Sequence, residues 1–218
     1  MSGEARPRRA YDATMRRAAA AQTRARIIDA AAGLFVEQGY VATTVPQIAT
    51  AAGVAVETVY RTATGKAGLL EAAVQSALAG GVERASLPVD ERPGIQRVIQ
   101  APSPAARLVA YAATQPGVWS RVGPLLRVLD EAAPADPALR RLQDEHAAFR
   151  RAGLRRFAGL LARDGALRPE LSVERAGDLI WTLAGPWNYE ALVTVCGWTH
   201  RQYESWLGAT LVRTLLSE

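Results

Sequence analysis

The sequence predicts an all-α protein. Alanine, leucine and arginine dominate, apolar residues recur three and four positions apart, and the alternating pattern of a half-buried strand is hard to find. With 218 residues the chain is long enough for one or two domains, and it can bury about 70% of the surface of its unfolded form. A hydrophobic content of 49% and a charged content of 22% are typical of a folded globular protein rather than a disordered one.

The first predicted helix begins near Asp12, which can cap it, and ends near Gly39. Its second half carries an apolar stripe at helical spacing, made of Ile27, Ala31, Leu34 and Phe35. This half is therefore expected to pack on other helices. The preceding part has no such stripe, and seven arginines occur in the first 26 residues. We therefore expect a basic, exposed N-terminal extension over residues 1–21.

Two short helices follow, joined by a tight turn. Thr44 and Gln47 have the spacing of a capping box, in which each side chain bonds to the backbone N–H of the other residue. Pro46 falls in the first turn, where its missing N–H costs little, and Gly53 ends the first short helix. The second short helix carries residues 57–61. With the longer helix before them, these elements predict a helix-turn-helix over residues 22–66.

The remaining residues continue the helical pattern. A helix opens around residues 64–66 and runs to residues 80–81, and four prolines then predict a loop with a short helix over 87–104. Later helices are expected over the following ranges: 104–132, 137–164, 172–184 and 199–216. The last of these begins with a second capping box, from Thr199 to Gln202.

The positive charge is concentrated near the N-terminus. Residues 1–66 contain nine basic and five acidic residues, a net charge of +4, whereas the remaining residues contain 17 and 16, a net charge of +1. A basic first third suggests that this part meets a polyanion. A basic tail that is merely solvated is the other interpretation of the same pattern.

Several functional classes are disfavoured. The single cysteine, Cys196, excludes an internal disulfide and is interpreted as a small buried side chain. His146 and His200 lie outside any HExxH pattern, and no nucleophile–base pair or carboxylate dyad stands out, so we expect no metal, no cofactor and no enzymatic activity. No apolar run reaches the roughly 20 residues that a membrane helix needs. A cytoplasmic protein is expected, with an arginine-rich transit peptide as a minor alternative.

The run from Arg24 to Leu70 resembles the DNA-binding domain of the TetR (tetracycline repressor-like) family of transcriptional regulators. The residues that carry this resemblance are Ile27, Ala30-Ala31, Leu34-Phe35, Gly39-Tyr40, Thr43-Thr44, Ile48-Ala49, Ala52-Gly53-Val54, Thr58, Tyr60 and Lys66-Ala-Gly-Leu-Leu70. The resemblance implies a set of DNA-binding residues: Arg24, Thr44, Glu57, Thr58, Tyr60, Arg61 and Lys66. It further implies that Lys66, the only lysine beside 25 arginines, contacts the DNA backbone.

The chemistry of the second short helix agrees with this role. Arg61 can read a guanine edge or hold a phosphate, and the sequence leaves both open. Tyr60 is expected to bond a phosphate through its hydroxyl, whereas Val59 should turn into the core.

Two residues depart from the family pattern. Ala63 stands where the family usually has a large aromatic residue, and the loss of such a buried group costs about 3–5 kcal/mol unless neighbours fill the space. Ala55 replaces a frequent serine, so the second short helix lacks a side-chain cap, a loss of about 1 kcal/mol.

The resemblance also implies that residues 67–218 form a helical domain that dimerises and encloses a small ligand. In the family the last two long helices form the dimer interface, here Ser172–Ala184 and Thr199–Leu216. The stripe of Leu207, Leu211 and Leu215 fits such an interface and fits core packing equally well. The predicted ligand pocket is lined by Tyr111, Gln115, Trp119, His146, Phe149 and Trp181, and its apolar walls suit a hydrophobic or aromatic effector.

Four of the five tryptophans fall between Trp181 and Trp206, where they can serve a core, an interface or a ligand wall. The sequence thus predicts a homodimeric, ligand-released repressor that binds a palindromic operator in double-stranded DNA. The alternative is an all-α small-molecule-binding protein or enzyme whose helix-turn-helix no longer functions.

Overall fold

A computed structural model describes the backbone of residues 7–217 and the side chains from Met15 onward. The described chain is helical, and its only extended pairing is an isolated antiparallel bridge between Leu167 and Leu216. The predicted all-α class is confirmed. The chain divides into two compact units, one ending at Ser86 and the other beginning at Leu87. Residues 1–6 of the predicted N-terminal extension lie outside the described part.

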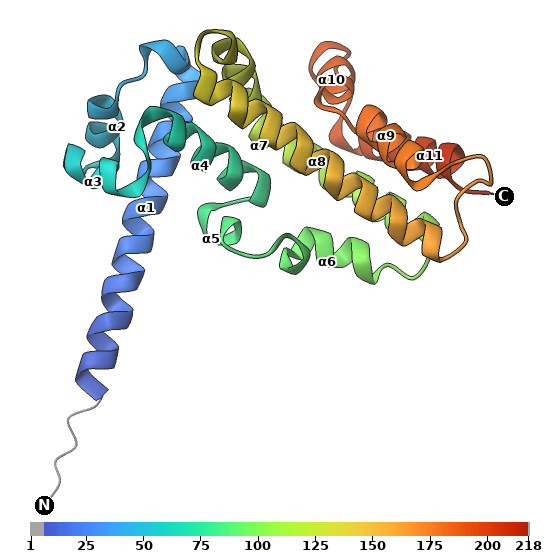
Figure 1. Cartoon of the computed structure of the whole chain (residues 1–218), viewed down its shortest axis with the longest axis horizontal. Helices are drawn as coiled ribbons and strands as arrows, with labels where there is room; N and C mark the ends of the chain where they lie inside the picture. The colour runs from blue at the N-terminus through green and yellow to red at the C-terminus, as the bar shows by residue number, and fades with distance from the viewer. Residues whose placement is uncertain (1–6, 218) are drawn as a thin grey trace, which may run out of the picture. The chain divides into compact units, whose positions relative to one another are not determined.

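The first unit contains five helices, α1 (Pro7–Ala42), α2 (Val45–Ala52), α3 (Val56–Thr62), α4 (Gly65–Ala79) and α5 (Val82–Ala85). The second half of α1 packs against α2 and α4, whereas its first half extends beyond them (Figure 1). The core of this unit is built from apolar side chains at helical spacing: Ile27, Ala31, Phe35, Ile48, Val59, Leu69, Leu70 and Val74. Because α4 shares this core with α1, packing divides the chain after α4 and α5, whereas the sequence placed the division after residue 66.

Local chemistry sets the turns of the first unit. Gly39, at a φ of 82°, interrupts α1, and the buried hydroxyl of Thr43 donates to the Gly39 carbonyl oxygen at 2.7 Å. The predicted capping box of α2 is confirmed, with Thr44 accepting from the Gln47 N–H and the Gln47 side chain bonded to the Thr44 backbone. Gly53 ends α2 in the left-handed conformation. The prediction that α1 begins at Asp12 is wrong, because the helix already begins at Pro7.

The second unit is organised around two long helices, α7 (Pro104–Ala132) and α8 (Pro137–Arg163). They run side by side in Figure 1, with α6 (Pro93–Gln100) packed on α7. Two further helices, α9 (Val173–Leu183) and α11 (His200–Leu215), pack on α8 and α7 respectively. Between them lie the short α10 (Pro186–Tyr189) and a π-helical segment, Glu190–Val195.

The α11 helix is closely packed within its own unit. Tyr203, Leu207, Leu211 and Leu215 are fully buried, and a Cβ added at Gly208 would lie 3.6 Å from the Cβ of Ala112 on α7. The leucine stripe of the last helix therefore serves the core of the subunit. Among the described residues, none of the helices combines the length and the apolarity that a membrane crossing requires.

Candidate nucleic-acid interface and effector pocket

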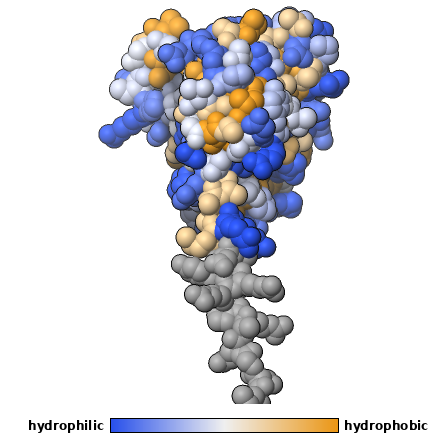
Figure 2. Space-filling model, turned by 90° about the vertical axis from the view of Figure 1, so that its left-hand side faces the viewer, coloured by the Kyte–Doolittle hydropathy of each residue, from blue (hydrophilic) through white to orange (hydrophobic). Residues whose placement is uncertain are grey.

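The α3 helix divides its side chains between the core and solvent. Val59 is 1% exposed and faces the core, whereas Tyr60 is 59% exposed and Glu57 and Arg61 are also exposed. Arg61 donates to the hydroxyl of the half-buried Thr58 at 3.1 Å, so the guanidinium lies along the helix surface. Figure 2 shows the side on which α2 and α3 lie in Figure 1, where hydrophilic side chains cover much of the surface around an apolar patch. The second helix of the helix-turn-helix thus presents polar groups outward.

Lys66, in the first turn of α4, makes hydrogen bonds to the backbone of its own subunit. Its Nζ lies 2.8 Å from the carbonyl oxygen of Tyr40, 3.4 Å from that of Val41, and 4.3 Å from the centre of the Tyr40 ring. The carbonyls at the end of a helix carry partial negative charge, which an ammonium group neutralises. Lys66 therefore caps the C-terminal end of α1, a structural role that the sequence did not indicate.

Arg24 makes a similar contact at the C-terminal end of α3. Its Nη1 donates to the carbonyl oxygen of Thr62, the last residue of α3, at 3.2 Å. Two of the three basic residues predicted to bind DNA, Arg24 and Lys66, thus each bond to the carbonyl groups at a helix end of the first unit. Thr44 is exposed at the N-terminus of α2, where its side chain completes the cap.

The two alanines that depart from the family pattern have visible consequences. Ala55 stands at the N-cap of α3 without a side-chain hydrogen bond, as predicted. Ala63, which follows α3, lines a hollow of about 590 Å³ between α1, α4 and α5. The hollow lies where the missing aromatic side chain was expected to pack.

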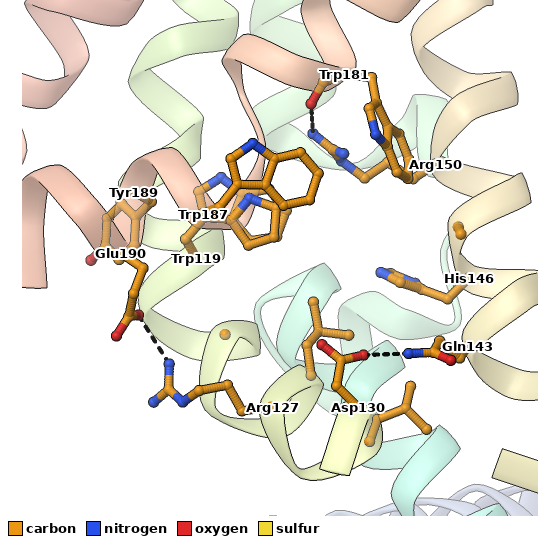
Figure 3. Close-up of a pocket in the computed structure, with 15 residues that line it drawn as sticks. Trp119, Arg127, Asp130, Gln143, His146, Arg150, Trp181, Trp187, Tyr189 and Glu190 are labelled. Carbon is orange, nitrogen blue, oxygen red and sulfur yellow. Dashed lines mark hydrogen bonds and ion pairs between the residues drawn. The ribbon is translucent and has the colours of Figure 1, made fainter. Parts of the chain in front are cut away.

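The second unit contains a hollow of about 370 Å³ (Figure 3). Its walls come from α7, α8 and the segment from the end of α9 through α10 to Glu190. Eight of its fifteen lining residues have aromatic or aliphatic side chains: Trp119, Leu126, Leu129, Ala147, Trp181, Pro186, Trp187 and Tyr189. Gly185 allows Trp187 to fold back here, because a Cβ at residue 185 would lie 2.5 Å from the indole ring.

Arg150 is the half-buried cation of this hollow. Its Nη2 donates to the carbonyl oxygens of Ala184 at 2.9 Å and Trp181 at 3.3 Å. The guanidinium carbon lies 4.3 Å from the centre of the Trp181 ring and 5.2 Å from that of Trp119, at cation–π distances. Burial lowers the pKa of Arg150, and nearby Tyr111 partly offsets this effect. The guanidinium nevertheless stays charged at neutral pH.

Two further polar pairs lie lower in Figure 3. Arg127 donates to Glu190 at 3.0 Å, and Gln143 donates to Asp130 at 2.7 Å. His146 lies between Arg150 and Asp130 in the same view. Burial, together with the charge of Arg150, lowers the pKa of His146, whereas Asp130 acts in the opposite direction. The imidazole is therefore neutral at pH 7.

The structure brings together three of the six residues predicted to line a ligand pocket, namely Trp119, His146 and Trp181. Tyr111 and Gln115 are buried on α7 without lining the hollow, and Phe149 is 55% exposed. Sequence reasoning missed Arg150, although it follows His146 by one helical turn, the spacing that places two side chains on one helix face.

The tryptophan-rich segment divides between two places. Trp181 and Trp187 line the hollow, whereas Trp198 and Trp206 pack edge to face with ring centres 6.2 Å apart. The interpretation of Cys196 as a buried side chain is wrong, because the thiol follows the π-helical segment and is exposed.

An all-helical chain that exposes the polar face of the second helix of a helix-turn-helix belongs to the helix-turn-helix class of DNA-binding proteins. The family model described as bacterial regulatory proteins, tetR family, matches residues 27–73. This match identifies residues 27–73 as a DNA-binding domain of the TetR family of transcriptional regulators. The regulators of this family are generally DNA-binding proteins without enzymatic activity.

Solved structures share the fold along most of the chain. NalD of Pseudomonas aeruginosa, the secondary repressor of the MexAB-OprM multidrug efflux pump, is 24% identical, with 90% of this chain and 97% of NalD covered and a TM-score of 0.66. FadR of Bacillus subtilis, crystallised with stearoyl-CoA, is 19% identical, with 86% and 96% covered and a TM-score of 0.67. The fatty acid degradation regulator FadR of Bacillus halodurans is 19% identical, with 87% and 94% covered and a TM-score of 0.67. No curated protein matches the chain.

Proposed function

We propose that this TetR-family regulator is a cytoplasmic, homodimeric repressor that leaves a palindromic operator when a small effector binds. The observation that carries the proposal is the outward face of α3, where Glu57, Tyr60 and Arg61 are exposed around the buried Val59. One such helix reads only a few base pairs, so two copies about one DNA turn apart are needed for a specific site.

The DNA contacts divide into two kinds. Tyr60 and Arg61 meet base edges or phosphates in the major groove, with Thr58 and Glu57 beside them. Thr44, Arg24 and Lys66 contact the phosphate backbone. An ammonium group has three N–H donors, so Lys66 keeps one for a phosphate while two bond the end of α1.

The dimer forms through α9 and α11. Because α11 uses its leucine stripe against α7, the interface uses the opposite face of the helix, where Arg201, Ser205 and Ala209 are exposed. Size measurement in solution tests this step. We expect the protein to be a dimer, and we expect this dimer to dissociate when a bulky charged residue replaces Ala209. A strictly monomeric protein would contradict the proposed mode of DNA binding.

The effector occupies the hollow lined by Trp119, His146 and Trp181. Its aromatic walls favour a hydrophobic or aromatic molecule, and the crystal of Bacillus subtilis FadR with stearoyl-CoA supports a small-molecule ligand on this fold. The effector releases DNA only to the extent that it binds the DNA-free arrangement of the dimer more tightly than the DNA-bound one.

Selection of bound sequences from random DNA, followed by affinity measurement at several salt concentrations, tests the DNA-binding step. About eight phosphate contacts per dimer give a log–log slope near −7. Arg61→Ala should relax the preference at one operator position, whereas Lys66→Ala should weaken binding to all sequences alike. Absent or salt-insensitive binding would favour a small-molecule-binding protein or enzyme with a non-functional helix-turn-helix.

A further inference from the structure

Arg150 lies between two indole rings without an acidic partner. Within the part of the chain that the structure describes, the ion pairs join other residues, and no carboxylate pairs with Arg150. Among the described residues, the groups that face its charge are neutral: two carbonyl oxygens at the end of α9, the rings of Trp119 and Trp181, and the nearby Tyr111 and Tyr203. Removing a cation from water without an anion is unfavourable, so the site gains from an anion that arrives with a ligand.

The guanidinium of Arg150 has more N–H donors than the described residues supply acceptors for. It carries five N–H groups in a planar fork, whereas the two carbonyl oxygens and the Tyr111 hydroxyl account for three acceptors. A second donor lies in the same wall, because the indole Nε1 of Trp119 is buried without a hydrogen-bond partner among the described residues. A carboxylate has two acceptor oxygens, which match these donors.

The other charged groups of the hollow have polar partners of their own. Arg127 and Glu190 form an ion pair with each other. Asp130 accepts from Gln143, and the neutral His146 lies between it and Arg150 in Figure 3. The positive end of the hollow is therefore the end at Arg150 and Trp181, and its negative end is at Asp130.

We propose that the hollow binds a monoanionic effector with an apolar body, and that Arg150 holds its carboxylate while the tryptophans enclose the body. This inference rests on the proposed function, since it names the chemical class of the effector. A cationic aromatic ligand fits less well, because Arg150 already occupies the faces of Trp119 and Trp181 that attract cations. A dianion would bring its second charge toward Asp130.

Calorimetric titration of the full chain with matched probes tests the proposal. The probes are 2-naphthoate and decanoate, each compared with its uncharged amide and with 2-naphthylmethylamine as a cation. We expect at least one acid to bind with a Kd below about 1 mM and about tenfold more tightly than its amide, the size of effect that a charge-assisted hydrogen bond supplies. An amide or the amine that binds as tightly as the acid would overturn the proposal, and so would the failure of both acids to bind.

Variants on α8 identify the residue that holds the carboxylate. Arg150→Gln should reduce the preference for acid over amide to less than about twofold. The control Arg151→Gln removes the neighbouring, exposed arginine, which pairs with Asp178 outside the hollow, and should keep the full preference. If thermal melting shows that Arg150→Gln is unfolded, Arg150→Lys decides the question. It keeps the charge but loses the planar fork, so the acid should lose at least about threefold in affinity while the amide stays unchanged.

The titrations use no DNA, so their result is separate from that of the operator experiments. Binding of an acid through Arg150 without release of DNA would leave the anion site standing and contradict effector release. Release of DNA by an uncharged ligand that Arg150→Gln binds normally would leave the repressor standing and overturn the anion site.

Discussion

Replacing Ala63 with phenylalanine should stabilise the DNA-binding unit. Ala63 follows α3 with φ and ψ of −152° and 155°, an extended conformation that an aromatic residue adopts readily. It lines the hollow of about 590 Å³, so a ring there has room to pack beside Ile28 and Ala72. The substitution supplies the aromatic side chain that the family pattern has and this chain lacks.

The expected gain follows from the buried ring surface. A ring that buries about 100 Å² of apolar surface contributes about 2.5 kcal/mol. Loss of rotamer freedom costs about 0.5–1 kcal/mol, which leaves about 1.5–2 kcal/mol. For a chain of this length, such a change raises the Tm by about 3–8 °C.

Thermal melting followed by circular dichroism measures this change. Ala51→Phe, at an exposed position of α2 outside the hollow, serves as the control and should leave the Tm unchanged or lower it slightly. An unchanged or lower Tm for Ala63→Phe would mean that the hollow is closed in solution, and the reasoning from the missing aromatic would fail.

Three other predictions concern the interior contacts. Lys66→Ala should lower the free energy of unfolding by about 1 kcal/mol in urea denaturation, because the end of α1 loses its cap; unchanged stability would leave the lysine with DNA contacts alone. Gly185→Ala should displace the Trp187 ring, which a Cβ would approach to 2.5 Å, and so red-shift the tryptophan emission and weaken probe binding; an unaltered spectrum would contradict the packing. His146 has a lowered pKa in the folded protein, so the unfolded chain binds its proton first, and stability should decline as the pH falls through about 6.5. His146→Gln should reduce this decline in urea titrations between pH 7 and 5, and a decline of the same size in the variant would contradict this role of His146.

Helix boundaries were predictable where a cap is encoded by neighbouring residues. The Thr44 and Thr199 capping boxes and the left-handed Gly53 depend on contacts within a few positions, and all three are present. The predicted range 104–132 agrees with the observed α7, which continues through its two internal prolines, Pro116 and Pro124. The start of α1 was missed because Asp12 is a good cap residue inside a segment that continues as a helix on both sides.

Features that depend on distant contacts could not be predicted in this way. The stripe with Leu207 suits an interface or a core equally, and only the packing against α7 decides between them. Cys196 looks like a core residue beside Val195, but the π-helical turn carries both to the surface. Arg150 resembles the other arginines of α8 until the end of α9 and two indole rings come to lie around it.

The contacts of Arg24 and Lys66 limit which substitutions can change the operator sequence that this regulator recognises. Each side chain bonds to the carbonyl groups at a helix end of the DNA-binding unit. A mutation at either position that alters DNA affinity therefore also weakens the packing that orients α3. Tyr60 is more than half exposed, and Arg61 bonds to Thr58 on its own helix. New operator preferences are therefore expected to evolve through these two positions, while the basic pair persists in descendants that read different sites.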